Sequence, residues 1–233
     1  YSFDLMTDAF GENMEFFKWN GVSYNKVNYL KAGEGYLTYS RYDEEVTLAK
    51  KVAWDLTEIT DMGTFKRMAP TRDNWELGIS LKSTNKGLVD SYNAIGVKPL
   101  AENGLDDYDK SELPASMGDA VVLSFKNGST ILRSDYRSTI EQSAEWQMSL
   151  GTTVEEGTEA QLSFEGYEAL RALGYSVYLF DGSQKSEIVS KEQNVTLKGA
   201  REYTLVVSDG PFEGSISPLR AQVSNFPNPV RNT

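Results

Sequence analysis

The densest group of side chains able to do chemistry in this sequence is a run of acidic residues near the middle of the chain. Its carboxylates belong to Asp106, Asp107, Asp109 and Glu112. Hard oxygen ligands this close together in a loop are what Ca²⁺ prefers. However, the spacing lacks the alternating ligands and central glycine of an EF-hand, and the same side chains could accept backbone hydrogen bonds in Asx turns. The run therefore predicts either a calcium site or a solvated acidic loop that ends at Pro114.

The residue types that are missing limit the remaining chemistry. The chain contains no histidine and no cysteine. Ser-His-Asp and Cys-His catalysis, imidazole and thiolate metal sites, and disulfides are therefore excluded. With 34 acidic residues, some carboxylate pair always has a separation suited to glycoside hydrolysis, but none stands in an apolar stretch that would raise its pKa. A carboxylate-dependent glycoside hydrolase is thus a less favoured alternative, and we expect no catalytic residues.

Aromatic residues offer a second kind of site. Four tryptophans and 13 tyrosines could provide a platform on which sugar rings stack. Trp75 and Trp146 lie within alternating segments, where a place in the core is the default. Trp19 adjoins the Asn20-Gly21 turn and is the tryptophan most expected at the surface. A carbohydrate-binding module that uses Trp19 as a glycan contact is therefore the main alternative to a structural role.

The elements that must position these residues are short β-branched or aromatic segments separated by Gly, Asn and Asp. The clearest series predicts strands at 175–180, 186–190, 194–197 and 202–207. In the last of these, Tyr203, Leu205 and Val207 share one face because side chains alternate along a strand. Such a sheet must bury its apolar face against a second layer. The fold class predicted is all-β: an antiparallel β-sandwich, Ig-like or jelly-roll-like.

Turn and helix signals complete the pattern. Hairpin corners are predicted at Asn20-Gly21, Asn127-Gly128 and Asp181-Gly182. The segment from Tyr167 to Leu173 is the one predicted helix, with Gly174 as its C-terminal cap. Between residues 82 and 118 the sequence predicts a long polar loop.

The pattern divides the chain into four regions: a small β-rich module at 1–42, transitional strands at 43–72, the sandwich at 73–209, and a linker with an extended arm at 210–233. The sequence opens in the middle of a pattern, so we expect the small module to continue before Tyr1. The arm, which includes Leu219 to Val230, could also add a strand to the sheet edge of a neighbouring molecule and so build a filament or layer.

The arm contains a short motif that resembles a known family. Its residues are Phe226, Pro227, Asn228 and Pro229. This motif resembles the opening of the C-terminal sorting domains of the type IX secretion system of Bacteroidota. Residues 29–40 resemble the end of a β-module common upstream of such domains, although Leu37 stands where the family usually has Trp. The resemblance implies export, cell-surface attachment, contact with the secretion machinery and a stalk or spacer role, without catalytic residues.

Charge narrows the partners further. The formal net charge is −11, which repels phosphate backbones, so nucleic-acid binding is not expected. No apolar run approaches the roughly 20 residues that span a bilayer. The sequence thus predicts a non-catalytic structural or interaction module of a secreted surface protein. Its expected partners are the secretion machinery, its own copies or surface glycans, and calcium is its only candidate cofactor.

Overall fold

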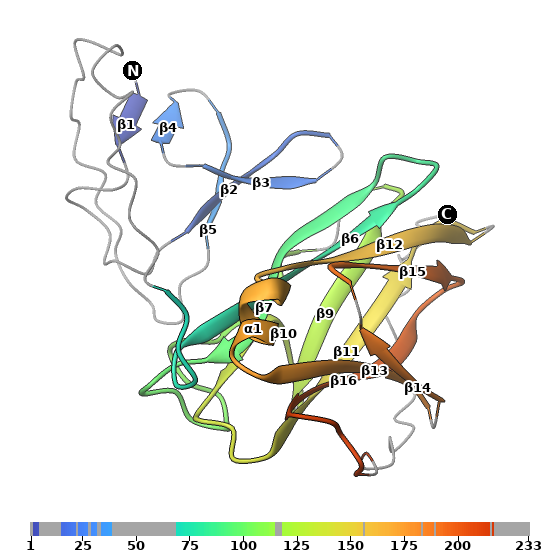
Figure 1. Ribbon diagram of the computed structural model, residues 1–233. Helices are drawn as coiled ribbons and strands as arrows, with labels where there is room; N and C mark the ends of the chain where they lie inside the picture. Colours follow the sequence, from blue (N-terminus) through green and yellow to red (C-terminus); the bar gives the residue numbers. More distant parts are fainter. Residues whose placement is uncertain are drawn as a thin grey trace.

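The chain is almost entirely β in the computed structural model, as the sequence predicts. The structure describes residues 2–4, 15–21, 23–27, 29–31, 34–38, 69–114, 118–155, 157–182, 184–188, 190–214 and 216. These residues form three sheets and one short helix. The smallest sheet pairs β1 (Ser2–Asp4) with β4 (Tyr29–Lys31). A three-stranded sheet has the order β3-β2-β5, from β2 (Phe16–Trp19), β3 (Tyr24–Val27) and β5 (Leu37–Thr38), and stands beside the main body (Figure 1).

The main body is built from an eleven-stranded sheet. Its strands are β6 (Trp75–Ser83), β7 (Val89–Val97), β8 (Lys110–Ser111), β9 (Val121–Asn127), β10 (Thr130–Arg137), β11 (Ser143–Thr152), β12 (Thr158–Glu165), β13 (Tyr175–Asp181), β14 (Gln184–Ile188), β15 (Glu192–Leu197) and β16 (Arg201–Asp209). The order is β14-β13-β16-β11-β9-β10-β7-β6-β12-β15, with β8 paired to β10. All of these pairings are antiparallel except that of β10 with β7.

Strand β10 carries the sheet from one layer of the sandwich to the other. Its first part, Thr130–Leu132, pairs with β9, whereas Ser134–Arg137 pairs with β7. Strands β14, β13, β16, β11 and β9 therefore form one layer, and β7, β6, β12 and β15 form the other (Figure 1). The corner at Arg133 brings one buried cation to the outer side of the second layer, where the small sheet lies.

The two layers enclose one main core because their strands alternate. Strand β6 buries every second side chain, and β11 and β16 supply the facing residues. The central side chains are Trp75, Leu77, Ile79, Leu81, Trp146, Met148, Leu150, Tyr203, Leu205 and Val207. Trp75 and Trp146 meet edge to face, with ring centroids 6.2 Å apart. Each fully buried leucine contributes about 1.5–3 kcal/mol. The predicted core role of both tryptophans and the shared face of β16 are confirmed.

One prediction about the fold is wrong. The polar loop expected between residues 82 and 118 contains β7, a nine-residue strand whose Ile95 and Val97 lie fully inside the core. The strand escapes notice because Asp90 and Asn93 interrupt its alternation. These two polar side chains hydrogen-bond each other instead of facing solvent, with Asn93 Nδ2 donating to Asp90 Oδ1 at 3.0 Å.

Turns and the helix follow their local chemistry. Helix α1 (Tyr167–Ala172) ends at Leu173, and Gly174 follows with a φ of 92°, a left-handed conformation that suits glycine at a helix end. Gly128 and Gly182 have positive φ at the β9–β10 and β13–β14 corners, so both hairpin predictions are confirmed. Strand β15 departs from the expected array: it pairs with β12 in the opposite layer.

The segment after β16 returns over the outer face of the sandwich. Phe212 is buried there against Tyr178, Phe180 and Val206. Its backbone N–H donates to Tyr178 Oη at 3.1 Å. The first residues of the predicted linker therefore pack on the sandwich. The sorting motif at 226–229, most of the predicted transitional strands and the rest of the arm lie outside the described residues. No helix among the described residues is long and apolar enough to cross a membrane.

Candidate functional site

The β2–β3 hairpin presents two aromatic rings next to each other. Trp19 pairs with Tyr24 across the hairpin, and their ring centroids are 5.0 Å apart at an angle of 58°. The loop between them is held by Asn20, whose Oδ1 accepts a hydrogen bond from the Ser23 N–H at 2.8 Å. Gly21 takes a φ of 100°. The turn predicted here is confirmed, and Trp19 is half-buried rather than fully exposed.

Arg133 docks this hairpin on the sandwich. Its guanidinium forms an ion pair with Glu15, lies 4.9 Å from the centre of the Phe17 ring, and donates to the Tyr92 carbonyl oxygen at 3.3 Å. The Phe17 and Tyr92 rings meet edge to face at 5.7 Å. Glu15 also pairs with Lys26 at 2.8 Å. Burial alone would raise the pKa of Glu15, but Arg133 and Lys26 outweigh it and hold that pKa below its usual value.

A bulge in β7 shapes the surface under the hairpin. The register passes from Leu81 opposite Asp90 to Ile79 opposite Asn93, so two residues of β7 face one residue of β6. Tyr92 adopts a φ of 70° in this bulge, a left-handed conformation that costs energy for a residue with a side chain. The bulge places Tyr92 against Phe17 and leaves Asp90 on the side of the cleft.

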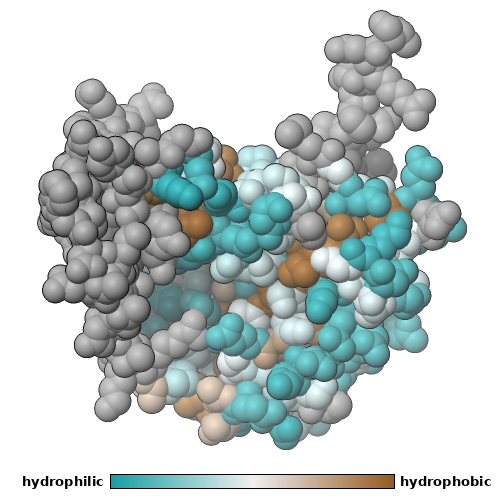
Figure 2. All heavy atoms as spheres, turned by 90° about the horizontal axis from the view of Figure 1, so that it is seen from above, coloured by the Kyte–Doolittle hydropathy of each residue, from teal (hydrophilic) through white to brown (hydrophobic). Residues whose placement is uncertain are grey.

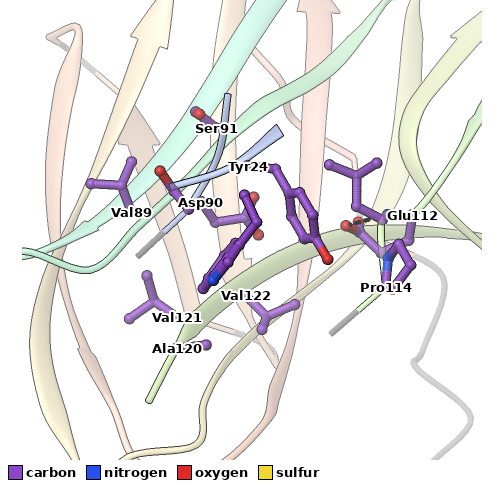
Figure 3. A pocket seen from close by; sticks show the side chains of 12 residues that line it. Tyr24, Val89, Asp90, Ser91, Glu112, Pro114, Ala120, Val121 and Val122 are labelled. Atoms are coloured by element: carbon purple, nitrogen blue, oxygen red, sulfur yellow. Dashed lines mark hydrogen bonds between the residues drawn. The ribbon is translucent and has the colours of Figure 1, made fainter. Parts of the chain in front are cut away.

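A small cleft lies between the hairpin tip and the sandwich (Figure 3). Its cavity volume is about 60 Å³. At roughly 15 Å³ for each water-sized probe, this space holds about four small groups. The lining residues are Trp19, Ser23, Tyr24, Val89, Asp90, Ser91, Glu112, Leu113, Pro114, Ala120, Val121 and Val122. None of these is basic, so the lining carries two negative charges and no positive one when both carboxyl groups are ionised.

The two carboxyl groups of the cleft differ in how well they are paired. Asp90 accepts from the Leu123 N–H at 2.6 Å and from Asn93 at 3.0 Å. Glu112 Oε1 accepts from the Leu113 N–H at 2.9 Å, whereas its buried Oε2 has no hydrogen-bond partner among the described residues. Figure 3 shows both residues around the Tyr24 ring, from different parts of the fold.

Burial makes both carboxyl groups weaker acids. It raises the pKa of Asp90 to about 6, against the opposing hydrogen bonds from Leu123 and Asn93. Burial and then the nearby Asp90 raise the pKa of Glu112 to about 8, and Arg133 opposes this shift. An isolated buried carboxylate is unfavourable, so the pair retains protons or takes up a cation.

The hydrolase alternative stays a prediction, and the cleft is where its carboxylate pair would lie. A desolvated carboxylate pair beside aromatic rings is what such chemistry would require, although no apolar stretch of sequence announced it. The cleft, about 60 Å³ in volume, suits a head group better than a sugar ring. Glycan contact by Trp19 stays a prediction, and its half-buried ring lies at the wall of this cleft.

The acidic run does not gather as one ligand set. Asp106 accepts from the backbone N–H groups of Glu102 and Tyr108, at 2.6 and 2.7 Å. Asp109 accepts from those of Asp106 and Tyr136, at 3.0 and 2.9 Å. Of the other two members of the run, Asp107 is exposed in the loop and Glu112 lines the cleft.

The loop nevertheless holds a second buried acid pair. Asp109 lies near Asp135, which is fully buried and pairs with Arg137 at 3.3 Å. Burial raises the pKa of Asp109 to about 6, while the hydrogen bonds from Tyr136 and Asp106 oppose it. No group of three or more acidic side chains suited to a metal occurs within the described residues. Calcium binding in this loop therefore stays a prediction.

A larger groove runs between the small sheet and the outer face of β6, β7 and β12. Its volume is about 910 Å³, and it is lined largely by polar residues such as Glu15, Glu76, Ser80 and Ser163. The view from above shows that hydrophilic residues dominate this side, with hydrophobic residues in small separate groups (Figure 2). Inside the groove, Tyr136 Oη donates to Glu76 Oε2 at 2.7 Å. The charged groups Glu15, Arg133 and Glu76 of the groove already have partners, unlike Glu112 Oε2 in the cleft.

Sequence reasoning missed the partners that define both sites. Asp90 and Asp135 lie in strands, far in sequence from the acidic run, and only the fold brings them beside Glu112 and Asp109. A signal for Asp90 did exist: Asp90 and Asn93 stand three residues apart and break an otherwise apolar strand.

The protein is an all-β sandwich with a small sheet docked on its outer face, and the cleft lies between the two. Comparison with protein-family models, with curated proteins and with solved structures found no match.

Proposed function

We propose that this protein is a non-catalytic structural and interaction module of an exported bacterial surface protein, acting as a stalk or spacer. The observation that carries the proposal is the docking of the small sheet through Arg133, Glu15 and Phe17. A spacer must hold successive modules in a fixed orientation. An ion pair and ring contacts around a buried arginine oppose bending more effectively than an exposed ion pair, which contributes about 0–1 kcal/mol.

The C-terminal end supports the export part of the proposal. The motif Phe226-Pro227-Asn228-Pro229 resembles the start of type IX sorting domains. Phe212 anchors the preceding segment on the sandwich.

Hydrogen–deuterium exchange tests the docking. The variant Arg133→Ala removes the ion pair and the ring contact, so we expect exchange at residues 15–27 to rise at least tenfold, while β11 and β16 remain protected. Arg201→Ala is the matched control, because its ion pair with Asp181 lies on the exposed surface of the sandwich. Unchanged exchange at 15–27 in Arg133→Ala would remove the support for a rigid spacer.

Surface exposure tests export independently. Protease treatment of intact cells of the producing organism should degrade the full-length protein, and joint substitution of Pro227 and Pro229 by alanine should retain it inside the cell. Wild-type protein that is protected in intact cells contradicts the proposal. Sedimentation velocity over a concentration series checks the filament or layer variant, which a purely monomeric protein would rule out.

A further inference from the structure

The cleft under the hairpin tip has a chemical character that the spacer role does not use. Its walls include the adjacent rings of Trp19 and Tyr24, and its lining includes the carboxyl groups of Asp90 and Glu112. The hydroxyl groups of Ser23 and Ser91 are the other polar side chains near these acids. Among the described residues, this lining offers many electron-rich surfaces and no positive charge.

An unsatisfied acceptor shows which kind of group is missing. Glu112 Oε2 is buried and accepts no hydrogen bond within the described part of the chain. Buried acceptors without donors are costly and uncommon in folded proteins. A ligand that brings N–H donors and positive charge would satisfy this oxygen and offset the charge of both carboxylates.

A cation of the sandwich acts on Glu112 but cannot supply these donors. Arg133 is close enough for its charge to influence Glu112. Its guanidinium is already committed to Glu15, the Phe17 ring and the Tyr92 carbonyl oxygen. The two lysines of the described hairpin residues are also paired, Lys18 with Glu34 at 2.6 Å and Lys26 with Glu15 at 2.8 Å. The carboxyl groups of the cleft therefore lie near an arginine whose own hydrogen bonds and ion pair are made with other residues.

Size selects among cationic ligands. A cavity of about 60 Å³ accepts an ammonium head with one or two carbons, and the chain behind it would pass out between the hairpin and the sandwich. Tryptophan and tyrosine faces attract such cations by about 0.5–1 kcal/mol at exposed sites, and by more when the cation is desolvated. A sugar ring would need more room, and its neutral hydroxyl groups would leave the carboxylates without a counter-charge.

We propose that the cleft binds a primary ammonium group of the kind carried by alkylamines and lysine side chains, with Glu112 and Asp90 as counter-ions and Trp19 and Tyr24 as walls. This inference goes beyond the spacer role. It requires the hairpin to be docked, but it does not require export, so failed binding and failed surface exposure are separate results.

Titration of the 233-residue chain with n-butylammonium chloride, followed by NMR, tests the proposal. We expect saturable shifts at the Trp19 indole and at amides of residues 112–114, and no such binding by n-butanol, which has the same carbon chain without the charge. High salt should weaken the binding, because charge attraction is screened. Equal binding of n-butanol would overturn the proposal, as would shifts confined to other parts of the surface.

Variants locate the site. Glu112→Gln keeps the side-chain shape and removes the charge, and should weaken n-butylammonium binding at least tenfold. Trp19→Ala should weaken it roughly two- to fivefold, the equivalent of an exposed cation–π contact. Glu141→Gln, on an exposed loop, is the matched control for net charge and should leave the affinity unchanged. If Glu112→Gln and Glu141→Gln have equal effects, the binding is general charge attraction and the proposal fails.

Two competing ligands complete the test. Calcium chloride and methyl β-glucoside are titrated under the same conditions. If calcium binds at Glu112 and excludes n-butylammonium, the cleft is a metal site. If the glucoside binds there and the amine does not, the cleft is a glycan site, and either result overturns the ammonium assignment.

Discussion

The acidic loop and the cleft each bury a pair of carboxyl groups, but they satisfy them in different ways. In the loop, Asp109 accepts two backbone N–H groups. Its neighbour Asp135 has one oxygen, Oδ1, without a hydrogen bond among the described residues, but its other oxygen is paired with Arg137 as counter-ion. In the cleft, Glu112 also has one oxygen without a donor among the described residues, and the arginine whose charge acts on it is engaged with Glu15. The loop pair therefore stabilises the fold, whereas the cleft pair is poised to take up a ligand.

The largest expected effect tests the structural half of this contrast. Asp109→Asn replaces one acceptor oxygen by an N–H₂ group that faces backbone donors, so one buried N–H loses its partner. The lost hydrogen bond lowers the free energy of unfolding by about 1–3 kcal/mol. Because the folded protein also raises the pKa of Asp109 to about 6, removal of the charge offsets part of this loss at pH 7 but not at pH 4, so we expect the larger fall at pH 4. Urea denaturation measures the change.

The control for this variant is Glu102→Gln, because the Glu102 side chain is exposed in the same loop. Its stability should stay within about 0.5 kcal/mol of wild type. If Asp109→Asn is as mild as this control, the loop carboxylate has no structural role, and the contrast with the cleft disappears.

The matching amide substitution in the cleft should act in the opposite direction. Because the folded protein raises the pKa of Glu112 from 4.5 to about 8, the native state holds a proton that the unfolded chain releases. Stability is therefore lost as the pH rises from about 4.5 towards 8. Gln does not titrate, so the stability of Glu112→Gln relative to wild type should rise with pH, by a few kcal/mol between pH 5 and pH 8, at about 1.4 kcal/mol for each unit of the pKa shift.

Denaturation of both proteins at pH 5, 6, 7 and 8 measures this difference. The decisive quantity is its dependence on pH, since a constant offset would reflect packing alone. A Glu112→Gln protein that is less stable than wild type at pH 8 would mean that the carboxylate already has a partner in the free protein.

The same contrast explains what the sequence could and could not predict. Alternation identified β16 and the core tryptophans because each strand buries one face, and Gly128 and Gly182 marked corners through a conformation that glycine adopts easily. Local spacing singled out Asp106 and Asp109. Spacing could not show that Glu112 lies with Asp90 in the cleft rather than with the rest of the acidic run. That arrangement depends on β7, which the sequence pattern predicted to be a loop.

Docking of the hairpin was equally beyond local reasoning. Arg133 and Glu15 are 118 residues apart, and nothing in their neighbourhoods indicates an ion pair. Trp19 was identified as a surface candidate from its turn alone. Its position at the wall of an acidic cleft arises from the docking, which is a property of the tertiary structure.

The smallest expected effect concerns calcium, and it bears on both regions. The loop carboxylates of Asp106 and Asp109 already accept four backbone hydrogen bonds, so a metal would have to compete with these donors. We expect 5 mM calcium chloride to change the free energy of unfolding by less than about 0.5 kcal/mol. So small a change means that any calcium binds with a dissociation constant in the millimolar range or weaker. Thermal denaturation with calcium, or with magnesium as control, measures this change.

A larger calcium-specific increase in stability that Asp109→Asn abolishes would make the loop a metal site. An increase that Glu112→Gln abolishes would place the metal in the cleft. Either result would replace the contrast between a structural pair and a ligand-binding pair by one between two occupied sites.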